Sequence, residues 1–284
     1  MPTTTTTTAL KFLPERWTPG LLQETTEEEV VGKNFSRPPG GVKKIGQKLH
    51  IPKMLAISAQ SGAGPYSTSL TYSSNTEEEV TVSPEQSYAA VEIQRSVYLR
   101  MDLNPDGPYR QMLKYALAEY RDVTCAGLAD NLATNVKGSA IASMDKGLLL
   151  DAQQALAISA KRRFKPGETL WYIKVHPLQL KNCMGVFDLT ADYVRGDAVR
   201  PLVSGWMSPV LGANIDESGN VLNTGGIIHN LAYIPEAFVI GFNEESTVLE
   251  PQPVELVVRI IATEEFGASE QFDEYAVDMQ TGQS

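Results

Sequence analysis

One stretch of the chain, residues 30–76, contains six Lys or Arg residues and no Asp or Glu, although the protein carries a net charge of −10. The stretch is rich in Gly and Pro, yet it includes an apolar block at residues 48–57 that favours burial over disorder. A structureless loop of this length is uncommon in a compact domain. The sequence therefore predicts a long two-stranded excursion from an acidic body.

The same pentapeptide, Thr-Glu-Glu-Glu-Val, brackets this stretch at residues 26–30 and 76–80. Two copies are too few for a repeat protein, so we expect them to form the two feet of a hairpin-like loop. The chain after Arg259 carries six acidic residues and no basic one. Such segregation of charge suits a subunit whose basic loop lies across another copy of itself. The candidate inter-subunit loop residues are Lys33, Arg37, Lys43, Lys44, Lys48 and Lys53.

Two other interpretations of the basic stretch stay open. Nucleic-acid binding usually needs a net basic domain, or Arg and aromatic residues interleaved along one face. Here Arg37 is the only Arg among the six basic residues. Between Lys33 and Lys53, the first and last of them, Phe35 is the only Phe, Tyr or Trp. A solvated, flexible loop is the second alternative, although the apolar block argues against it.

Length and composition limit the remaining possibilities. A chain of 284 residues with 42% hydrophobic content can bury one large core or two moderate ones. It has no apolar run of about 18 residues, so we expect no membrane span, and its N-terminus lacks the pattern of a secretion signal. Cys125 and Cys183 lack metal-binding spacing, and we expect buried thiols in a reducing compartment, with a disulfide as the alternative.

Apolar residues at spacings of three and four predict one long amphipathic helix, from residue 108 to about residue 136. Lys137 and Gly138 are its predicted stop. Such a helix would be about 43 Å long, more than a compact domain normally requires. A second helix is predicted over residues 148–164, with Asp145 as its N-cap.

Beyond the second helix, the apolar period falls to two, which is typical of strands. Trp171, Ile173 and Val175 predict one strand, and His176-Pro177 a short helix that follows it to about Met184. The remaining predictions are a hairpin turn at residues 214–221, a turn at residues 225–226, and a strand at residues 254–263 that begins after Pro251 and Pro253.

Nothing in the sequence indicates a catalytic, cofactor-binding or metal site. The three histidines lie far apart, and the Gly-rich residues 61–65 are not followed by the Lys-Ser/Thr of a phosphate loop. The acids near Asp216 lack the spacing of a calcium loop. Runs of Glu are usually solvated faces and not acid–base pairs. We therefore expect no cofactor and a protein that is not an enzyme.

The order of these segments resembles the major capsid proteins of tailed bacteriophages, which have the Hong Kong 97-type fold. The likeness covers nearly the whole chain and depends on order and spacing. The matching segments are residues 17–22 for the end of an N-terminal arm, 48–52 and 77–82 for the two sides of an extended loop, 109–136 for a spine helix, 149–152 with 171–177 for the opening of the axial domain, and 254–264, 266–267 and 275–277 for the returning strand and closing segment.

The resemblance implies an α+β fold with four parts. These are an N-terminal arm at residues 1–30, an extended β-loop at 31–80, a peripheral domain with the spine helix at 81–145 and 250–265, and an axial domain at 146–249 and 266–284. It also implies a structural protein that assembles as hexamers and pentamers into an icosahedral shell around packaged viral DNA.

The resemblance further implies partners and a location. We expect a virion capsid assembled in the host cytoplasm, DNA enclosed without sequence-specific binding, and no membrane association. Because only about 30 residues precede the loop, we expect a separate scaffolding protein, with a portal; a decoration protein is left open. We assume no covalent crosslink between subunits. The alternatives are an encapsulin-like bacterial nanocompartment shell and a phage tail or adhesion module.

Overall fold

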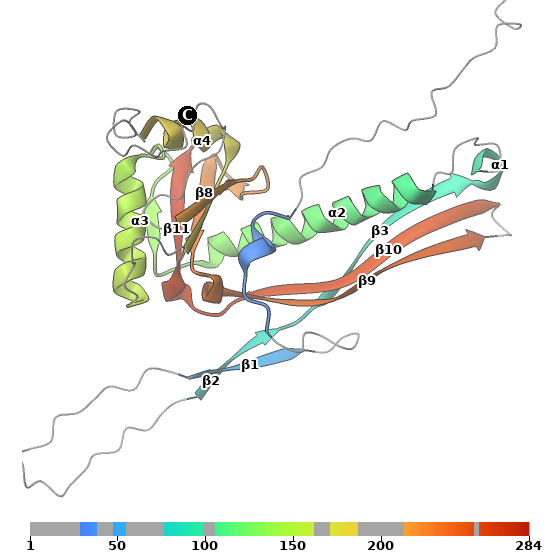
Figure 1. Ribbon diagram of the computed structural model, residues 1–284, viewed down its shortest axis with the longest axis horizontal. Coiled ribbons are helices and arrows are strands. Elements are labelled where there is room, and N and C mark those ends of the chain that lie inside the picture. Colours follow the sequence, from blue (N-terminus) through green and yellow to red (C-terminus); the bar gives the residue numbers. More distant parts are fainter. Residues whose placement is uncertain are drawn as a thin grey trace, which may run out of the picture.

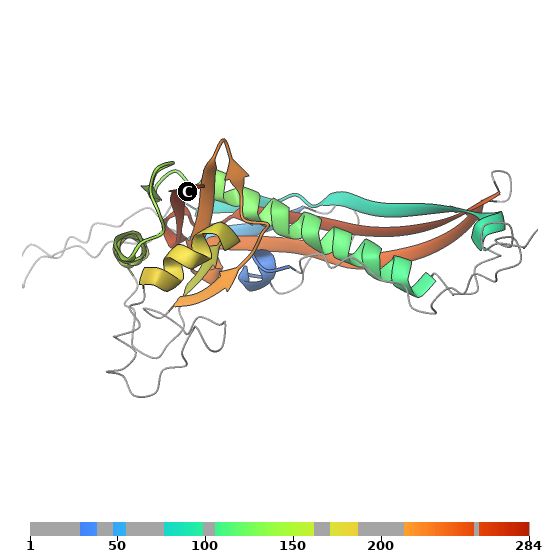
Figure 2. The ribbon, with the colours of Figure 1, turned by 90° about the horizontal axis from the view of Figure 1, so that it is seen from above.

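The computed structural model describes residues 29–38, 48–54, 77–98, 106–161, 171–186, 213–252 and 256–283. These residues form an elongated α+β molecule, with a body at one end and a long, narrow extension at the other (Figures 1 and 2). The predicted α+β class is therefore confirmed. No helix within these ranges is long and apolar enough to cross a lipid bilayer.

The extension is an antiparallel three-stranded sheet with one long helix along it (Figure 2). Its strands, in spatial order, are β3 (Glu85–Gln94), β10 (Val257–Glu270) and β9 (Phe238–Gln252). The helix α2 (Asp106–Gly127) packs Leu113 and Leu117 against Ile93 and Ile260 of the sheet. Because strand side chains alternate between faces, Tyr88 lies on the opposite face, where it is 74% exposed. A short helix, α1 (Arg95–Tyr98), follows β3.

The long helix ends earlier than the sequence predicted. After Gly127 the chain tightens into a 3-10 turn, η3 (Leu128–Asn131), and residues 136–138 form a strand, β4 (Val136–Gly138). With 22 residues, α2 is about 33 Å long instead of about 43 Å. The cause is tertiary packing: Ala129 and Leu132 turn into the core of the body, and Gly127 offers little helix propensity to oppose this turn.

The body is a six-stranded mixed sheet flanked by helices. Its main path runs β4, β11 (Ala276–Gly282), β8 (Ile227–Tyr233), β5 (Trp171–Val175) and β6 (Ala213–Glu217), and β7 (Asn223–Thr224) pairs with β8. Strands β5 and β6 run parallel, whereas β8 runs antiparallel to both of its neighbours, β5 and β11. Two helices accompany the sheet, α3 (Lys146–Ser159) and α4 (Pro177–Val186).

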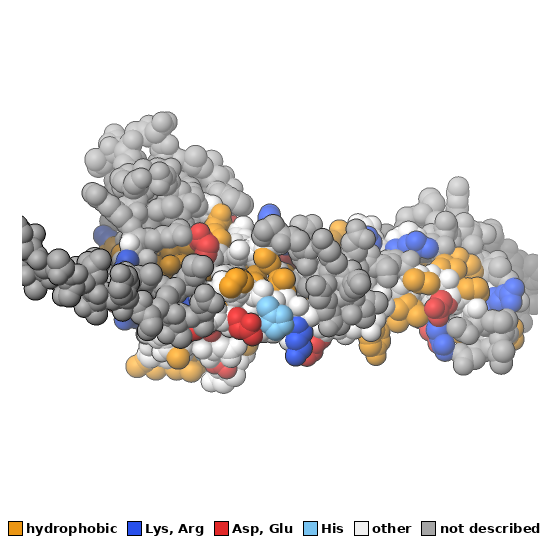
Figure 3. Space-filling model, turned by 90° about the horizontal axis from the view of Figure 1, so that it is seen from below, with side chains coloured by type: hydrophobic (Ala, Val, Ile, Leu, Met, Phe, Trp, Pro, Cys, Tyr) orange, Lys and Arg blue, Asp and Glu red, His pale blue; other side chains and the backbone are white. Residues whose placement is uncertain are grey.

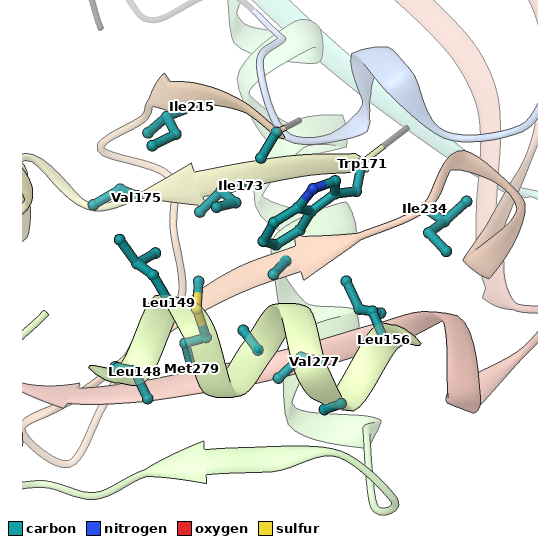
Figure 4. Close-up of a cluster of buried hydrophobic side chains, with 14 of the residues drawn as sticks. Leu148, Leu149, Leu156, Trp171, Ile173, Val175, Ile215, Ile234, Val277 and Met279 are labelled. Atoms are coloured by element: carbon teal, nitrogen blue, oxygen red, sulfur yellow. The ribbon is translucent and has the colours of Figure 1, made fainter. Parts of the chain in front are cut away.

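Helix α3 supplies much of the body's core (Figure 4). Its buried Leu149 and Leu156 face the sheet, where Trp171, Ile173 and Met279 meet them. The predicted strand at residues 171–175 is therefore confirmed, and its alternation places the apolar side chains on this core.

The start of α3 is also as predicted, because the Asp145 carboxylate accepts a hydrogen bond from the Leu148 amide at 2.7 Å. The helix ends at Ser159, five residues before the predicted end at Phe164. Helix α4 agrees with the predicted short helix after His176.

Two predictions about turns and strands need correction. Residues 213–217 form strand β6, parallel to β5, and are not part of a hairpin turn. Pro251 belongs to the end of β9, an edge strand, so it does not mark the start of β10. The turn at Gly225 and Gly226 is confirmed, and both residues have the positive φ angles that favour Gly.

The excursion predicted from the basic stretch is a hairpin of β1 (Leu49–Met54) and β2 (Glu77–Val82). Its strands pair antiparallel, with Leu49 opposite Val82, and the hairpin lies beside the three-stranded sheet near the body (Figure 1). The two acidic pentapeptides are not paired feet. The second enters β2, whereas Val30, at the end of the first, is bound to α2.

Candidate functional site

We call residues 29–36 the strap. The sequence predicts that this segment spans the end of the N-terminal arm and the start of the extended loop. The strap includes a single 3-10 turn, η2 (Gly32–Asn34), and packs between α2 and the body (Figure 1). Val31 and Phe35 are 1% and 4% exposed, as buried as core residues. The expected loop boundary at residue 31 therefore falls inside the packed core.

One carboxylate, that of Asp122 on α2, holds the start of the strap. Its Oδ1 atom accepts hydrogen bonds from three consecutive backbone amides, those of Val30 at 3.0 Å, Val31 at 2.6 Å and Gly32 at 3.0 Å. Its Oδ2 atom accepts a hydrogen bond from the Asn220 side chain at 3.0 Å. Asp122 is fully buried, so these hydrogen bonds are shielded from water. One carboxylate therefore joins the strap to α2 and to Asn220.

A second set of charges runs beside Asp122. Arg121 lies 3.5 Å from Glu29 of the strap and 2.5 Å from Glu264 of β10, and its guanidinium lies over the ring of Phe242. Glu29 also pairs with Arg37 at 3.3 Å. Since the Glu264 side chain is 0% exposed, the ion pair with Arg121 is desolvated. This network of ion pairs connects the strap to both α2 and β10 of the long sheet.

The far end of the strap is held by aromatic packing and backbone pairing. The Phe35 ring stacks on Phe238 at 4.6 Å and meets Tyr233 edge-on at 5.0 Å. The Tyr233 hydroxyl donates to the Val31 carbonyl at 2.8 Å, and burial raises the pKa of this hydroxyl well above its ordinary value. Ser36 forms a parallel bridge with Val239 at the start of β9. Both sides of the strap thus have specific partners.

The strap also covers Cys125, a buried thiol on α2. A Cβ atom on Gly32 would lie 2.7 Å from the Cys125 Sγ atom, so only Gly fits there without displacement. Burial raises the pKa of this thiol well above its ordinary value, and Asp122 and Glu29 add to the shift. The prediction of a buried thiol is confirmed for Cys125, whereas the Cys183 side chain lies outside the described residues.

The β1–β2 hairpin brings basic and acidic residues together. Lys53 lies 3.9 Å from Glu78 and 4.6 Å from the centre of the Phe272 ring, and its side chain is only 19% exposed. His50 lies 3.5 Å from Glu79. Part of the basic charge predicted to meet another copy is therefore balanced within this hairpin.

The six candidate loop residues fall in three places. Lys33 and Arg37 lie in or next to the strap, and both are exposed. Lys48 and Lys53 lie at the hairpin, where Lys48 is the more exposed. Lys43 and Lys44 lie outside the described residues. The structure thus separates residues that the sequence grouped as one basic loop.

The sequence reasoning missed the buried charges that organise this site. Three of the acids after Arg259 are buried, namely Glu264, Glu265 and Asp278, although runs of acids were read as solvated faces. A signal was present on α2, where the spacing of four through Leu113, Leu117, Arg121 and Cys125 continues one buried face. An Arg within that ladder indicates a buried partner.

The chain matches no protein-family model and no curated protein sequence. Solved structures do match it. One from Mycobacterium phage Che8 aligns with a TM-score of 0.77 and 19% identity, covering 96% of this chain and 97% of that one.

Two further matches carry capsid descriptions. The capsid asymmetric unit of cyanophage Pam1 aligns with a TM-score of 0.74 and 12% identity over 95% of this chain and 96% of that one. The capsid of Ralstonia phage GP4 aligns with a TM-score of 0.73 and 12% identity over 95% of each chain. The chain therefore has the fold seen in these phage capsid structures, in agreement with the resemblance in the order of its segments.

Proposed function

We propose that this chain is a structural shell subunit, the major capsid protein of a tailed bacteriophage. In this proposal, copies assemble as hexamers and pentamers into an icosahedral shell that encloses packaged viral DNA. The observation that carries the proposal is the fold match, which extends over 95% or more of this chain and of each capsid chain reported above. The protein's role is then assembly and not catalysis.

The shape of the molecule supports this proposal. The long sheet and the hairpin project from the body and offer surfaces that a single body does not bury (Figure 1). Tyr88 and Val248 are exposed on the open face of the sheet. The described side chains on one long side mix apolar, basic and acidic types (Figure 3). Mixed surfaces fix the register between subunits, while each exposed ion pair adds only about 0 to 1 kcal/mol.

Specific contacts and partners follow as proposals. Of the four loop candidates that the structure describes, Lys33, Arg37 and Lys48 are expected to contact a neighbouring subunit most directly, because these three are exposed. We propose a separate scaffolding protein and a portal as partners, with a decoration protein left open, and no covalent crosslink. The shell would form in the host cytoplasm and enclose DNA without sequence-specific binding, which suits an acidic chain.

The test is to express the chain alone and with its scaffolding partner, and to image the sedimenting fraction by negative-stain electron microscopy. Closed particles of uniform diameter are expected. DNA inside native particles would support the capsid assignment, whereas an enzyme cargo would indicate an encapsulin-like compartment. Rings or fibres would indicate a tail or adhesion module, and small oligomers under all salt conditions would refute the shell proposal.

A further inference from the structure

The strap lies between two other segments of the chain. Residues 1–28 precede it, and residues 37–48 connect it to β1 of the hairpin. The strap is therefore the described segment that joins these parts of the chain to the body. The described contacts of the strap are made to α2, β8 and β9 of the same chain.

The strap is held from two sides that are distant in sequence. Asp122 of α2 accepts hydrogen bonds from the amides of residues 30–32 of the strap, 90 to 92 residues away along the chain. The second half of the strap is held by ring contacts of Phe35 with Tyr233 and Phe238, and by the backbone bridge between Ser36 and β9. Losing the Asp122 carboxylate would leave buried amides without their acceptor, a state that proteins avoid by local opening. Strap binding should therefore be sensitive to the loss of the Asp122 carboxylate alone.

We propose that Asp122 acts as a clamp that keeps the strap docked, and that the docked strap is required for shell assembly because it positions the hairpin that follows it in the chain. The assembly half of this proposal rests on the proposed shell function, whereas the clamp itself does not. Asp122 is thus a positioning residue, because it is fully buried and acts through the strap.

The thiol of Cys125 provides a direct readout of strap docking. The strap covers it, and burial raises its pKa, so it should react slowly with a thiol reagent while the strap is bound. All variants should carry Cys183→Ser, so that Cys125 is the only thiol. Asp122→Ala is expected to speed Cys125 labelling about tenfold or more by local opening, without loss of helical circular dichroism. The matched control is Asp151→Ala, an exposed Asp on α3.

A disulfide can lock the strap in place. The Cβ position of Gly32 lies 3.4 Å from the Cβ atom of Cys125, just below the separation of about 3.5–4.5 Å that a disulfide requires. Oxidised Gly32→Cys should therefore join the strap to α2 after a shift of a few tenths of an ångström. Gly32→Ser introduces a similar side chain without the bond and serves as the control.

Assembly of these variants, scored as particle yield, decides between two roles for the strap. Asp122→Ala should lose most of its particles, while Asp151→Ala should not. The oxidised Gly32→Cys variant should assemble as well as its reduced form, and the lock should restore assembly to Asp122→Ala. If the locked strap instead blocks assembly and reduction releases the block, the strap must leave its site, and the proposal is overturned.

The thiol measurement separates failure of the clamp from failure of the proposed function. Unchanged Cys125 labelling in Asp122→Ala would refute the clamp, whatever the particle yield. If the unmutated chain forms no shells, the assembly half fails together with the shell function, while faster labelling would still establish the clamp.

Discussion

The ion pair between Arg121 and Glu264 should respond unequally to the loss of either partner. Arg121→Met removes a guanidinium 2.5 Å from a carboxylate whose side chain is 0% exposed. Leaving a buried charge without its counter-charge typically costs about 3–5 kcal/mol, because its hydration cannot be restored. We therefore expect Arg121→Met to lower the free energy of unfolding by an amount in this range.

Glu264→Gln should cost less. The Gln carbonyl oxygen can still accept a hydrogen bond from Arg121, and the guanidinium keeps Glu29 at 3.5 Å and the ring of Phe242 at 5.1 Å. We expect a loss of about 1–2 kcal/mol, the scale of one hydrogen bond. The double variant Arg121→Met with Glu264→Leu removes both charges, so its stability should return to within about 2 kcal/mol of the starting protein.

The assay is urea denaturation of unassembled subunits, with stabilities compared at constant slope. The matched control is the exposed pair of Arg259 and Glu92, 2.9 Å apart, for which Arg259→Met should cost no more than about 1 kcal/mol. The reasoning is refuted if Glu264→Gln lowers the free energy of unfolding as much as Arg121→Met does, or if the double variant is the least stable. Burial of the Glu264 carboxylate would then not determine the stability of these variants.

Three further predictions concern single positions. Gly32→Ala should destabilise by about 1–3 kcal/mol through its contact with Cys125, and Cys125→Ala should relieve most of this loss in a thermal melt. Asp145→Ala should cost about 1 kcal/mol by removing the N-cap of α3, whereas Asp145→Asn should cost less; equal losses would argue against the cap. Burial raises the pKa of Asp278 above its ordinary 3.8, so the folded state binds the proton more tightly and stability falls as pH rises through the raised pKa. Asp278→Asn removes this titration, so its melting temperature relative to that of the unmutated protein should rise as the pH increases above the ordinary pKa of 3.8, and a difference independent of pH would contradict this.

Local pattern predicted much of the fold. The alternation through Trp171, Ile173 and Val175 placed a strand correctly, and Asp145 was recognised as a cap, because both depend on neighbours in sequence. The end of α2 depended on where Ala129 and Leu132 find a core, which spacing along one helix does not show. Local sequence pattern therefore predicts which helices and strands form, but not where each of them ends.

The strap could not be predicted for a related reason. Asp122 binds amides about 90 residues away, and its burial is visible only once the strap is in place. Similarly, the basic residues 30–76 looked uniform because the sequence separates Lys53 from Glu78, which strand pairing brings opposite each other. Charges that are paired across the fold are read from sequence as charges facing solvent.

The long sheet also has a mechanical consequence. Strand β10 has 14 residues, so at about 3.3 Å per residue it extends roughly 46 Å from the body to the far tip of the sheet. A rotation of about 5° at the body end would move that tip by about 4 Å, roughly the spacing between neighbouring strands. Helix α2 packs Leu113 and Leu117 against the sheet, and this packing should resist bending of the strands. Small angular adjustments near the strap are thus converted into large displacements at the tip, the end of the molecule farthest from the body.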